Sequence, residues 1–340
     1  MSDSAPSAMA REIAEIPALS EGLVARQESI AELATYIERA SPRAVVVCGR
    51  GSSGHVGTYL RYLFEARCGL LVSVAAPSVV TAYRRPPDMR ETLFIVVSQS
   101  GQSADIVETT KLARSQGALT LALVNDEGSP VVQAAELVLP IAAGPERSIA
   151  ATKTVALAMT AGALLVATLA RDEELDEALL SLPQRLERAM ACDWSAWGGS
   201  LATARAAFVA GRGHGLGSAR EIALKLSETL RLPALGYSTA ELRHGPRAAI
   251  TKTTPVLVLR QADETAAAAD GLVRDLREAG NSVFCAGGFE ATLPWLEDGH
   301  PVSDPIAMLI PAYRAIEAAA QKAGLDPDNP PFLNKVTSTL

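Results

Sequence analysis

The chain has 340 residues, a length that predicts two domains at a prior of roughly 150 residues per domain. With 48% hydrophobic and 20% charged residues it can bury sizeable cores, which excludes an intrinsically disordered protein. The net charge of −7 offers no electrostatic basis for binding nucleic acid or an anionic membrane, so neither is an expected partner.

Residues 1–40 predict an N-terminal helical segment, because apolar side chains recur at helical spacing from Ile13 to Ile37. The first residues include early acidic side chains and no apolar core, so they do not have the pattern of a secretion signal. We therefore expect a cytoplasmic protein whose scattered cysteines stay reduced. No two cysteines form a CxxC pair, and no metal site is expected. The cysteines are Cys48, Cys68, Cys192 and Cys285.

Residues 41–170 predict a first α/β domain. Short, continuous apolar runs alternate with helical patterns, which is typical of a parallel sheet covered by helices on both faces. These runs are residues 44–48, 70–75, 93–97, 119–124 and 136–141. The charge-free run 154–170 reaches the lower length limit for a membrane span, but its Ala, Thr and Gly content favours a buried helix, so no membrane is expected.

Residues 171–198 predict an amphipathic helical linker, after which the pattern starts again. Strand-like runs follow at 206–210, 254–259 and 282–287, and the strand, Gly-Arg-Gly and helix of residues 44–65 are echoed at 206–228. The echo predicts a second copy of the α/β unit over residues 199–324 and a tail over 325–340.

The first glycine-rich loop fits two kinds of ligand. Its glycines between residues 49 and 54 match G-x-G-x-x-G, the dinucleotide-binding fingerprint. That fingerprint also needs an acidic residue at the end of the second strand, and the run 70–75 continues without one, which argues against nicotinamide or flavin. Glycines also let a backbone approach an anion at a helix N-terminus, where Ser52 and Ser53 would donate; a tight turn with solvated serines is the alternative.

The second polar loop, SQSGQS at residues 98–103, follows the third strand. Ser98, Ser100 and Ser103 offer hydroxyl donors and Gln99 an amide, at a sheet edge that commonly binds ligands. The set suits a phosphate monoester that is held and not transferred, because the lysine of a P-loop is absent. A set of helix-capping serines is the alternative.

Further candidates follow later in the chain. Residues 144–154 pass from a strand into a helix, where Thr152 would either bind phosphate or cap the helix. In the second repeat, Lys225 lies four residues after Glu221 and three before Glu228, so the three can share a helix face. A solvated ion pair of Glu221 with Lys225 is the plainer interpretation.

Four motifs in the same order resemble the sugar isomerase (SIS) domain family. They are SQSGQSAD, GPERSIAATK, ALKLSET and AELRHGP, which begin at residues 98, 144, 223 and 240. The resemblance covers nearly the whole chain from about residue 30. The chain is similar in particular to the isomerase half of glucosamine-6-phosphate synthase and to stand-alone glucosamine-6-phosphate deaminases.

The resemblance implies two tandem SIS domains, each a doubly wound, flavodoxin-like, five-stranded parallel sheet flanked by helices. It implies a homodimer with sites completed across subunits, a hexosamine phosphate or related phosphosugar as ligand, and no cofactor. Ser103 stands where the family usually has threonine, which keeps the hydroxyl. The residues placed at the phosphosugar are Gly51, Ser52, Ser53, Ser98, Gln99, Ser100, Ser103 and Ile149.

The resemblance also implies the catalytic roles. Glu228 would move a proton between C1 and C2 of the sugar, with Lys225 near that base. His244, contributed by the partner subunit, would open the sugar ring; a lone histidine before Gly-Pro otherwise has a structural role. Lys335 would form an imine with the ketose. The family's arginine ahead of that lysine is absent, and residues 331–332 are Pro and Phe.

The expected reaction is isomerising deamination of glucosamine 6-phosphate with water to fructose 6-phosphate and ammonia. Position 2 is serine, where the synthase has the cysteine of its glutaminase domain, so we expect no internal ammonia source. Four alternatives stay open: a galactosamine 6-phosphate deaminase, a deglycase of a phosphorylated fructosamine, a synthase-like aminotransferase without its glutaminase domain, and a non-catalytic phosphosugar sensor. Glu228, His244 and Lys335 together argue against the sensor, which needs only the serine loop.

Overall fold

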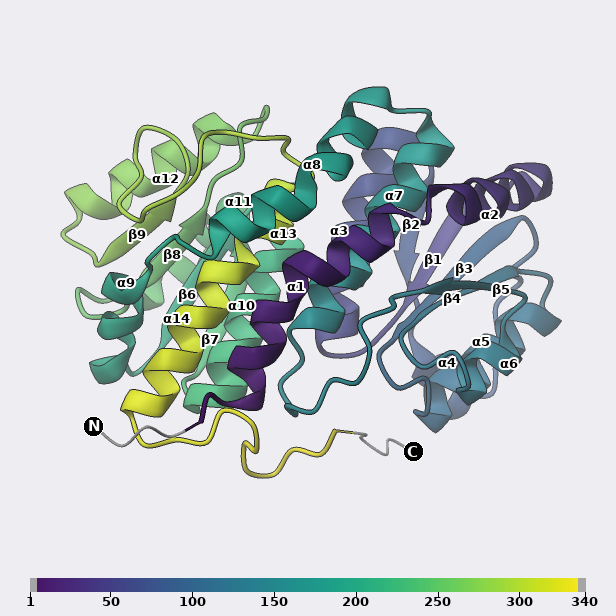
Figure 1. The fold of residues 1–340 in the computed structure, drawn as a ribbon, viewed down its shortest axis with the longest axis horizontal. Coiled ribbons are helices and arrows are strands. Elements are labelled where there is room, and N and C mark those ends of the chain that lie inside the picture. Colours follow the sequence, from purple (N-terminus) through teal and green to yellow (C-terminus); the bar gives the residue numbers. More distant parts are fainter. Residues whose placement is uncertain (1–4, 336–340) are drawn as a thin grey trace. The chain divides into compact units, whose positions relative to one another are not determined.

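The computed structural model describes residues 5–335, which divide into two compact units (Figure 1). The first-sheet unit comprises, within that range, residues 18–145, 154–180 and 334–335. The second-sheet unit comprises residues 5–17, 146–153 and 181–333. Both units are discontinuous in sequence, and the predicted domain boundaries stay a prediction.

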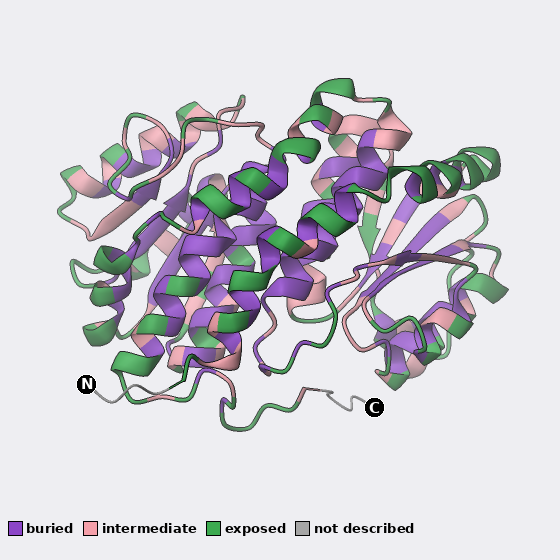
Figure 2. Ribbon diagram, in the orientation of Figure 1, coloured by how far each residue is buried: buried purple, intermediate pink, exposed green. Residues whose placement is uncertain are grey.

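The first sheet has the five parallel strands that were expected, in the order β2-β1-β3-β4-β5. This order is that of flavodoxin-like folds. Its central strands β3 and β4 are almost fully buried, which explains their continuous apolar sequences (Figure 2). The strands are β1 (Ala44–Cys48), β2 (Leu71–Val74), β3 (Thr92–Ser98), β4 (Leu119–Val124) and β5 (Leu137–Pro140).

Helices cover both faces of the first sheet. Ile106 of α5 shares a core cluster with Phe94 and Val96 of β3. Gly57 of α3 lies instead against Val47, which points to the other face because side chains alternate along a strand. The helices that begin in this unit are α2 (Gln27–Ala40), α3 (Ser52–Leu63), α4 (Pro77–Thr81), α5 (Ala104–Ser115), α6 (Pro130–Ala134) and α8 (Glu173–Ala189).

The long apolar helix α7 (Lys153–Ala170) is the one helix in residues 5–335 that is long and apolar enough to cross a membrane. In the fold, 83% of it is buried. A buried apolar helix is typical of a protein core, which agrees with the buried helix predicted for residues 154–170.

The second sheet has four parallel strands in the described chain, in the order β7-β6-β8-β9, so the expected count of five is wrong for this sheet. The order repeats that of the first four strands of the first sheet, as the sequence repeat predicts. Sequence reasoning missed β7. The strands are β6 (Ala207–Gly211), β7 (Ala234–Ser238), β8 (Val256–Leu259) and β9 (Val283–Ala286).

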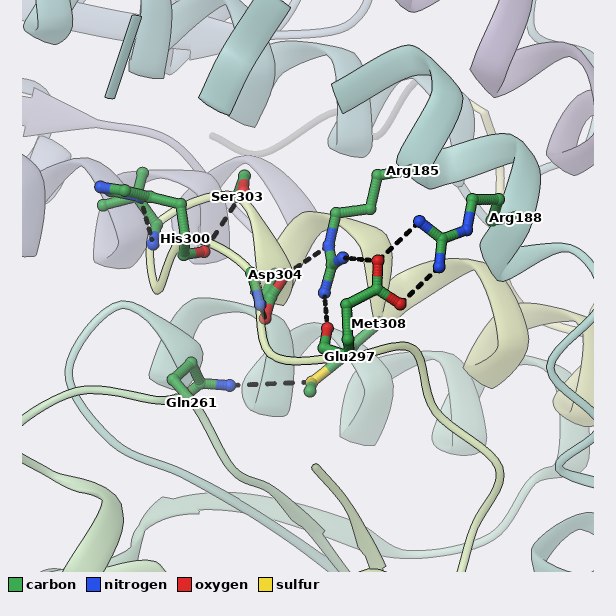
Figure 3. A network of polar contacts seen from close by, with 10 residues as sticks. Arg185, Arg188, Gln261, Glu297, His300, Ser303, Asp304 and Met308 are labelled. Carbon is green, nitrogen blue, oxygen red and sulfur yellow. Dashed lines mark hydrogen bonds and ion pairs between the residues drawn. The ribbon is translucent and has the colours of Figure 1, made fainter. Parts of the chain in front are cut away.

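An irregular segment, residues 287–303, follows β9 where a fifth strand was expected. Gly287 and Gly288 have φ of +92° and +71°, which ends the extended conformation at once. Hydrogen bonds from Arg185 of α8 then hold the segment (Figure 3): its Nε donates to Oδ1 of Asp304, the residue after the segment, at 2.6 Å, and its Nη2 donates to the Glu297 carbonyl at 2.6 Å. The buried guanidinium therefore fixes the segment without a strand ladder.

Helices of the second-sheet unit pack on its sheet and on one another. Helix α10 packs on α14, and the charged face of α10 is buried. The helices are α9 (Ser195–Ser200), α10 (Gly215–Leu230), α11 (Thr239–Arg243), α12 (Ala266–Glu278), α13 (Asp304–Ala307), α14 (Leu309–Lys322) and the first part of α1 (Ala8–Val24).

Candidate active site

Two polar loops open at one edge of the first sheet. Residues 49–51 follow β1 and residues 99–103 follow β3, and both strands run in the same direction as neighbours. The connections leave β1 and β3 towards opposite sides of the sheet, so this is its topological switch point, where α/β proteins bind ligands. Each loop leads into a helix N-terminus, which favours an anion.

The loop after β1 makes a tight turn into α3. Gly51 is the N-cap residue, with φ +51° and ψ −128°, a conformation that favours glycine. A Cβ at Gly49 would lie 2.8 Å from the backbone carbonyl of Ser53, so a side chain there would block the turn. Ser52 and Ser53 form the first turn of α3 and are half-buried, with the exposed Gly51 beside them.

The loop after β3 uses its serine oxygens as acceptors. The amide of Gly101 donates to Ser98 Oγ at 3.0 Å, and the amide of Gln102 donates to Ser100 Oγ at 3.4 Å. A hydroxyl that accepts one bond keeps its own hydrogen for donation, so both serines can still donate to a ligand oxygen.

The same loop bears on the alternative that its serines only cap helix α5. Ser103 occupies the N-cap position of α5 but makes no side-chain capping bond. Gln99, between the two turn serines, is half-buried like Ser98, Ser100 and Ser103. Helix capping therefore does not account for Ser103.

An ion pair that the sequence reasoning missed joins the two loops. Arg50 donates from Nε to Asp105 Oδ2 at 2.8 Å, across 55 positions of sequence. Asp105 is buried and also accepts from the amide of Ile106 at 2.9 Å. The Arg50 side chain is half-exposed. The Gly-Arg-Gly repeat and the final Asp of SQSGQSAD were visible signals, but only the fold pairs them.

The acidic and basic residues of α10 form a buried cluster in the second-sheet unit. Lys225 and Glu221 are both fully buried, with 3.4 Å between Lys225 Nζ and Glu221 Oε1, so the interpretation as a solvated ion pair is wrong. Lys225 Nζ also donates to Glu228 Oε2, on the next turn. The Glu228 side chain keeps 19% of its exposure, which leaves it the one of the three that a ligand can reach.

A tyrosine completes the cluster. Tyr313 of α14 is fully buried and donates to Glu221 Oε1 at 3.4 Å. Burial raises the pKa of Tyr313 well above 10, and the neighbouring Glu221 raises it further, so the phenol stays a donor. Burial alone would lower the pKa of Lys225, but Glu221 and Glu228 outweigh it and the pKa is raised, so the lysine stays charged.

The remaining predicted residues lie at separate places. His244 is exposed at the C-terminal end of α11, and its imidazole makes no hydrogen bond or ion pair to Glu228 or another residue within 5–335. Lys335 is the last residue described and belongs to the first-sheet unit. The serine loops belong to that unit too, whereas Glu228 and His244 belong to the other.

Ile149 and Thr152 lie in the segment ahead of α7, in the second-sheet unit. The amide of Ile149 donates to the carbonyl of Asp328 at 3.0 Å, so this amide is already bonded within the protein. Thr152 is fully buried, and within the described chain its Oγ1 has no hydrogen-bond partner, so the alternative of a helix-capping threonine is not observed. Its amide donates to Glu146 Oε1 at 3.0 Å.

No group of three or more His, Cys, Asp or Glu side chains within residues 5–335 is arranged to hold a metal ion. The three most buried cysteines are Cys48, Cys192 and Cys285, and all four cysteines are free. Burial raises the pKa of Cys48 and of Cys285 to about 12, so these thiols stay protonated.

Comparison with known proteins places this arrangement in a family. The model of the SIS domain matches residues 40–168 and 200–286. Over 354 aligned residues the chain is 32% identical to glutamine–fructose-6-phosphate aminotransferase [isomerizing] of Symbiobacterium thermophilum, covering 96% of this chain and 58% of that protein. The chain thus spans little more than half the length of this curated relative.

Solved structures of similar length share the fold. A presumed phosphosugar isomerase from Silicibacter pomeroyi DSS-3 is 37% identical, with a TM-score of 0.89 over 95% of this chain and 100% of that one. Glucosamine-6-phosphate deaminase from Thermotoga maritima is 21% identical, with a TM-score of 0.80 over 98% of this chain and 100% of that one, a likeness of fold alone. The matched domains, the repeated sheets and the sequence identity lead to one conclusion: this chain belongs to the SIS domain family.

Proposed function

We propose that this chain is an isomerising phosphosugar deaminase, which converts glucosamine 6-phosphate and water to fructose 6-phosphate and ammonia. The observation that carries the proposal is Glu228, a partly exposed carboxylate backed by the fully buried Lys225. A proton shuttle between neighbouring carbons needs a carboxylate that a substrate can reach and that the fold holds in one orientation. Family membership supports a phosphosugar as the class of substrate.

The phosphate would bind at the two loops of the first sheet. Ser98 and Ser100 present hydroxyl hydrogens, and the N-termini of α3 and α5 add partial positive charge. Arg50 is half-exposed beside them, although Asp105 balances its charge. Neutral and partly compensated donors suit a phosphate that stays attached throughout the reaction.

In the proposed chemistry, His244 of the partner subunit opens the sugar ring to the aldehyde. Glu228 takes the proton from C2 and returns it to C1, which turns the amino aldose into a ketose imine. Lys335 displaces ammonia from C2 to form its own imine, and water then hydrolyses that imine to release fructose 6-phosphate. One water is consumed and one ammonia is released, with no oxidant or reductant.

The aminotransferase alternative has an observation in its favour, because the curated relative named above is an isomerising aminotransferase. The two functions differ in their nitrogen chemistry. The deaminase releases ammonia from an amino sugar phosphate, whereas the aminotransferase consumes nitrogen supplied from glutamine. The same assay tests galactosamine 6-phosphate and a phosphorylated fructosamine as substrates. Binding without turnover is tested by a ligand-dependent thermal shift. We also propose a homodimer and a cytoplasmic location.

The test is an ammonia-release assay of the purified chain with glucosamine, galactosamine and fructosamine phosphates, without glutamine. We expect ammonia and fructose 6-phosphate from glucosamine 6-phosphate, and loss of turnover by a factor of about 100 or more in Glu228→Gln. Glu278→Gln, which changes an exposed glutamate of α12, is the matched control and should keep full turnover.

Three outcomes would contradict the proposal. Ammonia release from a different phosphosugar alone would reassign the substrate. A ligand-dependent thermal shift without turnover would identify a sensor. Full activity in Glu228→Gln would remove that residue from the mechanism.

A further inference from the structure

The first turn of α1 is capped by a carboxylate from the opposite end of the chain. The amide of Ala8 donates to Asp328 Oδ2 at 2.7 Å, and the amide of Met9 donates to Asp328 Oδ1 at 2.8 Å. These amides have no partner within the helix, so both oxygens of one carboxylate satisfy donors that would otherwise need water. The contact ties the tail after α14 to the start of the chain.

The same tail residue and the same helix also hold the segment before α7. The carbonyl of Asp328 accepts from the amide of Ile149 at 3.0 Å. Glu12, one turn further along α1, accepts from the amide of Arg147, and its Oε2 accepts from the amide of Ser148 at 3.3 Å. Three successive amides, at residues 147–149, are thus bound by α1 and the tail together.

Glu12 is a buried carboxylate that binds backbone amides. It is 4% exposed, and burial raises its pKa, although the amide of Arg147 acts in the opposite direction. The charges around it are Glu146, which also raises its pKa, and Lys153, which lowers it. Lys153 is itself buried and pairs with Glu15 Oε2 at 2.5 Å. The carboxylate is therefore held for its backbone contacts and not as a surface charge.

Asp326 accepts hydrogen bonds from the turn around Asp328. Asp326 Oδ1 accepts from the amide of Asp328 at 2.9 Å, and Asp326 Oδ2 accepts from Asn329 Nδ2 at 2.9 Å. These two bonds hold the backbone of Asp328 and the side chain of Asn329 to one carboxylate. Lys335 lies seven residues beyond Asp328 in the sequence.

We propose that Glu12 and Asp328 are positioning residues, which clasp the segment 147–149 and the C-terminal tail to α1 so that both enter the active site in a fixed arrangement. The term clasp denotes Glu12, Asp328 and the three amides that they bind. The roles of Ile149 and Lys335 in this inference rest on the proposed function; the clasp itself rests on the hydrogen bonds.

Hydrogen exchange tests the clasp without any assumption about activity. Full-length Asp328→Ala should speed amide exchange about 2- to 30-fold in peptides that cover residues 5–12, 144–152 and 326–335, the range expected for the loss of a helix cap. Glu12→Gln keeps the shape but weakens charge-assisted bonds, and should speed exchange at 144–152 about fivefold. Glu21→Gln, an exposed glutamate of the same helix, is the matched control and should change nothing.

The isosteric Asp328→Asn is the second variant if Asp328→Ala fails to fold, because its amide oxygen can still accept from one of the two amides. Faster exchange in all three peptides supports the clasp. Faster exchange confined to residues 5–12, with 144–152 and 326–335 unchanged, would overturn it and leave Asp328 as a helix cap only.

Steady-state kinetics distinguish a positioning role of Asp328 from a role in stability alone. With glucosamine 6-phosphate, Asp328→Ala should lower kcat about tenfold or more and change KM less than twofold, because the phosphate loops lie in the other unit. An unchanged kcat in a variant whose tail exchanges faster would overturn the positioning role. If the wild-type chain turns over no phosphosugar, the proposed function fails, and the exchange measurement still decides the clasp.

Discussion

At the scale of single residues, the burial of Lys225 indicates that the charged cluster on α10 has a functional role. A lysine with no exposure costs several kcal/mol unless paired, and here two carboxylates pair with it and a buried tyrosine donates to one of them. Hydrophobic residues of the same volume would often stabilise a helix pair equally well. We therefore interpret the ion cluster as serving the orientation of Glu228.

Removing that lysine should destabilise the protein strongly. We predict that Lys225→Met lowers the free energy of unfolding by about 3–5 kcal/mol, because Glu221 is left as a buried, unpaired charge. The double variant Glu221→Gln/Lys225→Met removes that charge and should recover about half of the loss. Urea unfolding at pH 7 measures both. A loss below about 1 kcal/mol in the single variant would contradict the buried pair.

The same cluster predicts the direction of a pH effect. The folded-state pKa of Lys225 is raised above the ordinary 10.5, so its stabilisation is complete below that pH and is lost as pH rises through the folded pKa. At neutral pH the full contribution is therefore present, which is why the comparison of variants belongs there.

At the scale of elements, the β3–α5 loop shows how a backbone turn orients a hydroxyl donor. Gly101 has φ +62°, and a Cβ there would lie 2.0 Å from Ser129 Oγ, so glycine is required at the bend. The bend brings the Gly101 amide to Ser98, which fixes the direction of that hydroxyl. The loop is thus pre-organised before any ligand arrives.

Removing two hydroxyls from this loop should weaken substrate binding more than folding. For Ser98→Ala/Ser100→Ala we predict a KM for glucosamine 6-phosphate raised about tenfold or more, from two lost hydrogen bonds to a charged group. The loss of the turn contacts should cost about 1–2 kcal/mol of stability. Steady-state kinetics and thermal unfolding measure the two effects. An unchanged KM with lowered stability would mean that the serines only support the turn.

At the scale of the whole molecule, the proposed dimer makes a prediction that needs both Glu228 and His244. Glu228→Gln and His244→Ala should each be inactive alone. If His244 serves the partner subunit, unfolding and refolding an equal mixture should restore about a quarter of wild-type activity, because half of the dimers are mixed and one of their two sites is intact. Ammonia release after refolding measures this, with each variant refolded alone as the control. No recovery in confirmed mixed dimers would place both residues in one chain.

The sequence predicted much of the fold because most strands carry a continuous apolar run. All five strands of the first sheet lie at the predicted runs, and three of the four in the second sheet do. The missed strand β7 is partly exposed along its length and contains Gly236, where a Cβ would lie 2.5 Å from the Arg220 backbone. The close approach of α10 leaves no space for a side chain at this position. A glycine in a short, half-polar stretch does not predict a strand.

The local chemistry can be deduced from the sequence alone: serine loops after buried strands, a carboxylate and a lysine on one helix face, and the order of motifs that marks the SIS family. Which of these groups are buried, and what they contact, depends on how the chain packs in three dimensions. Glu221 and Lys225 could have formed a solvated pair; the packing of α14 made them a core cluster. Asp105 with Arg50, and Asp328 with the start of α1, meet only because the fold closes long loops. Periodicity records which side chains face a core, but it holds no information on partners far along the chain.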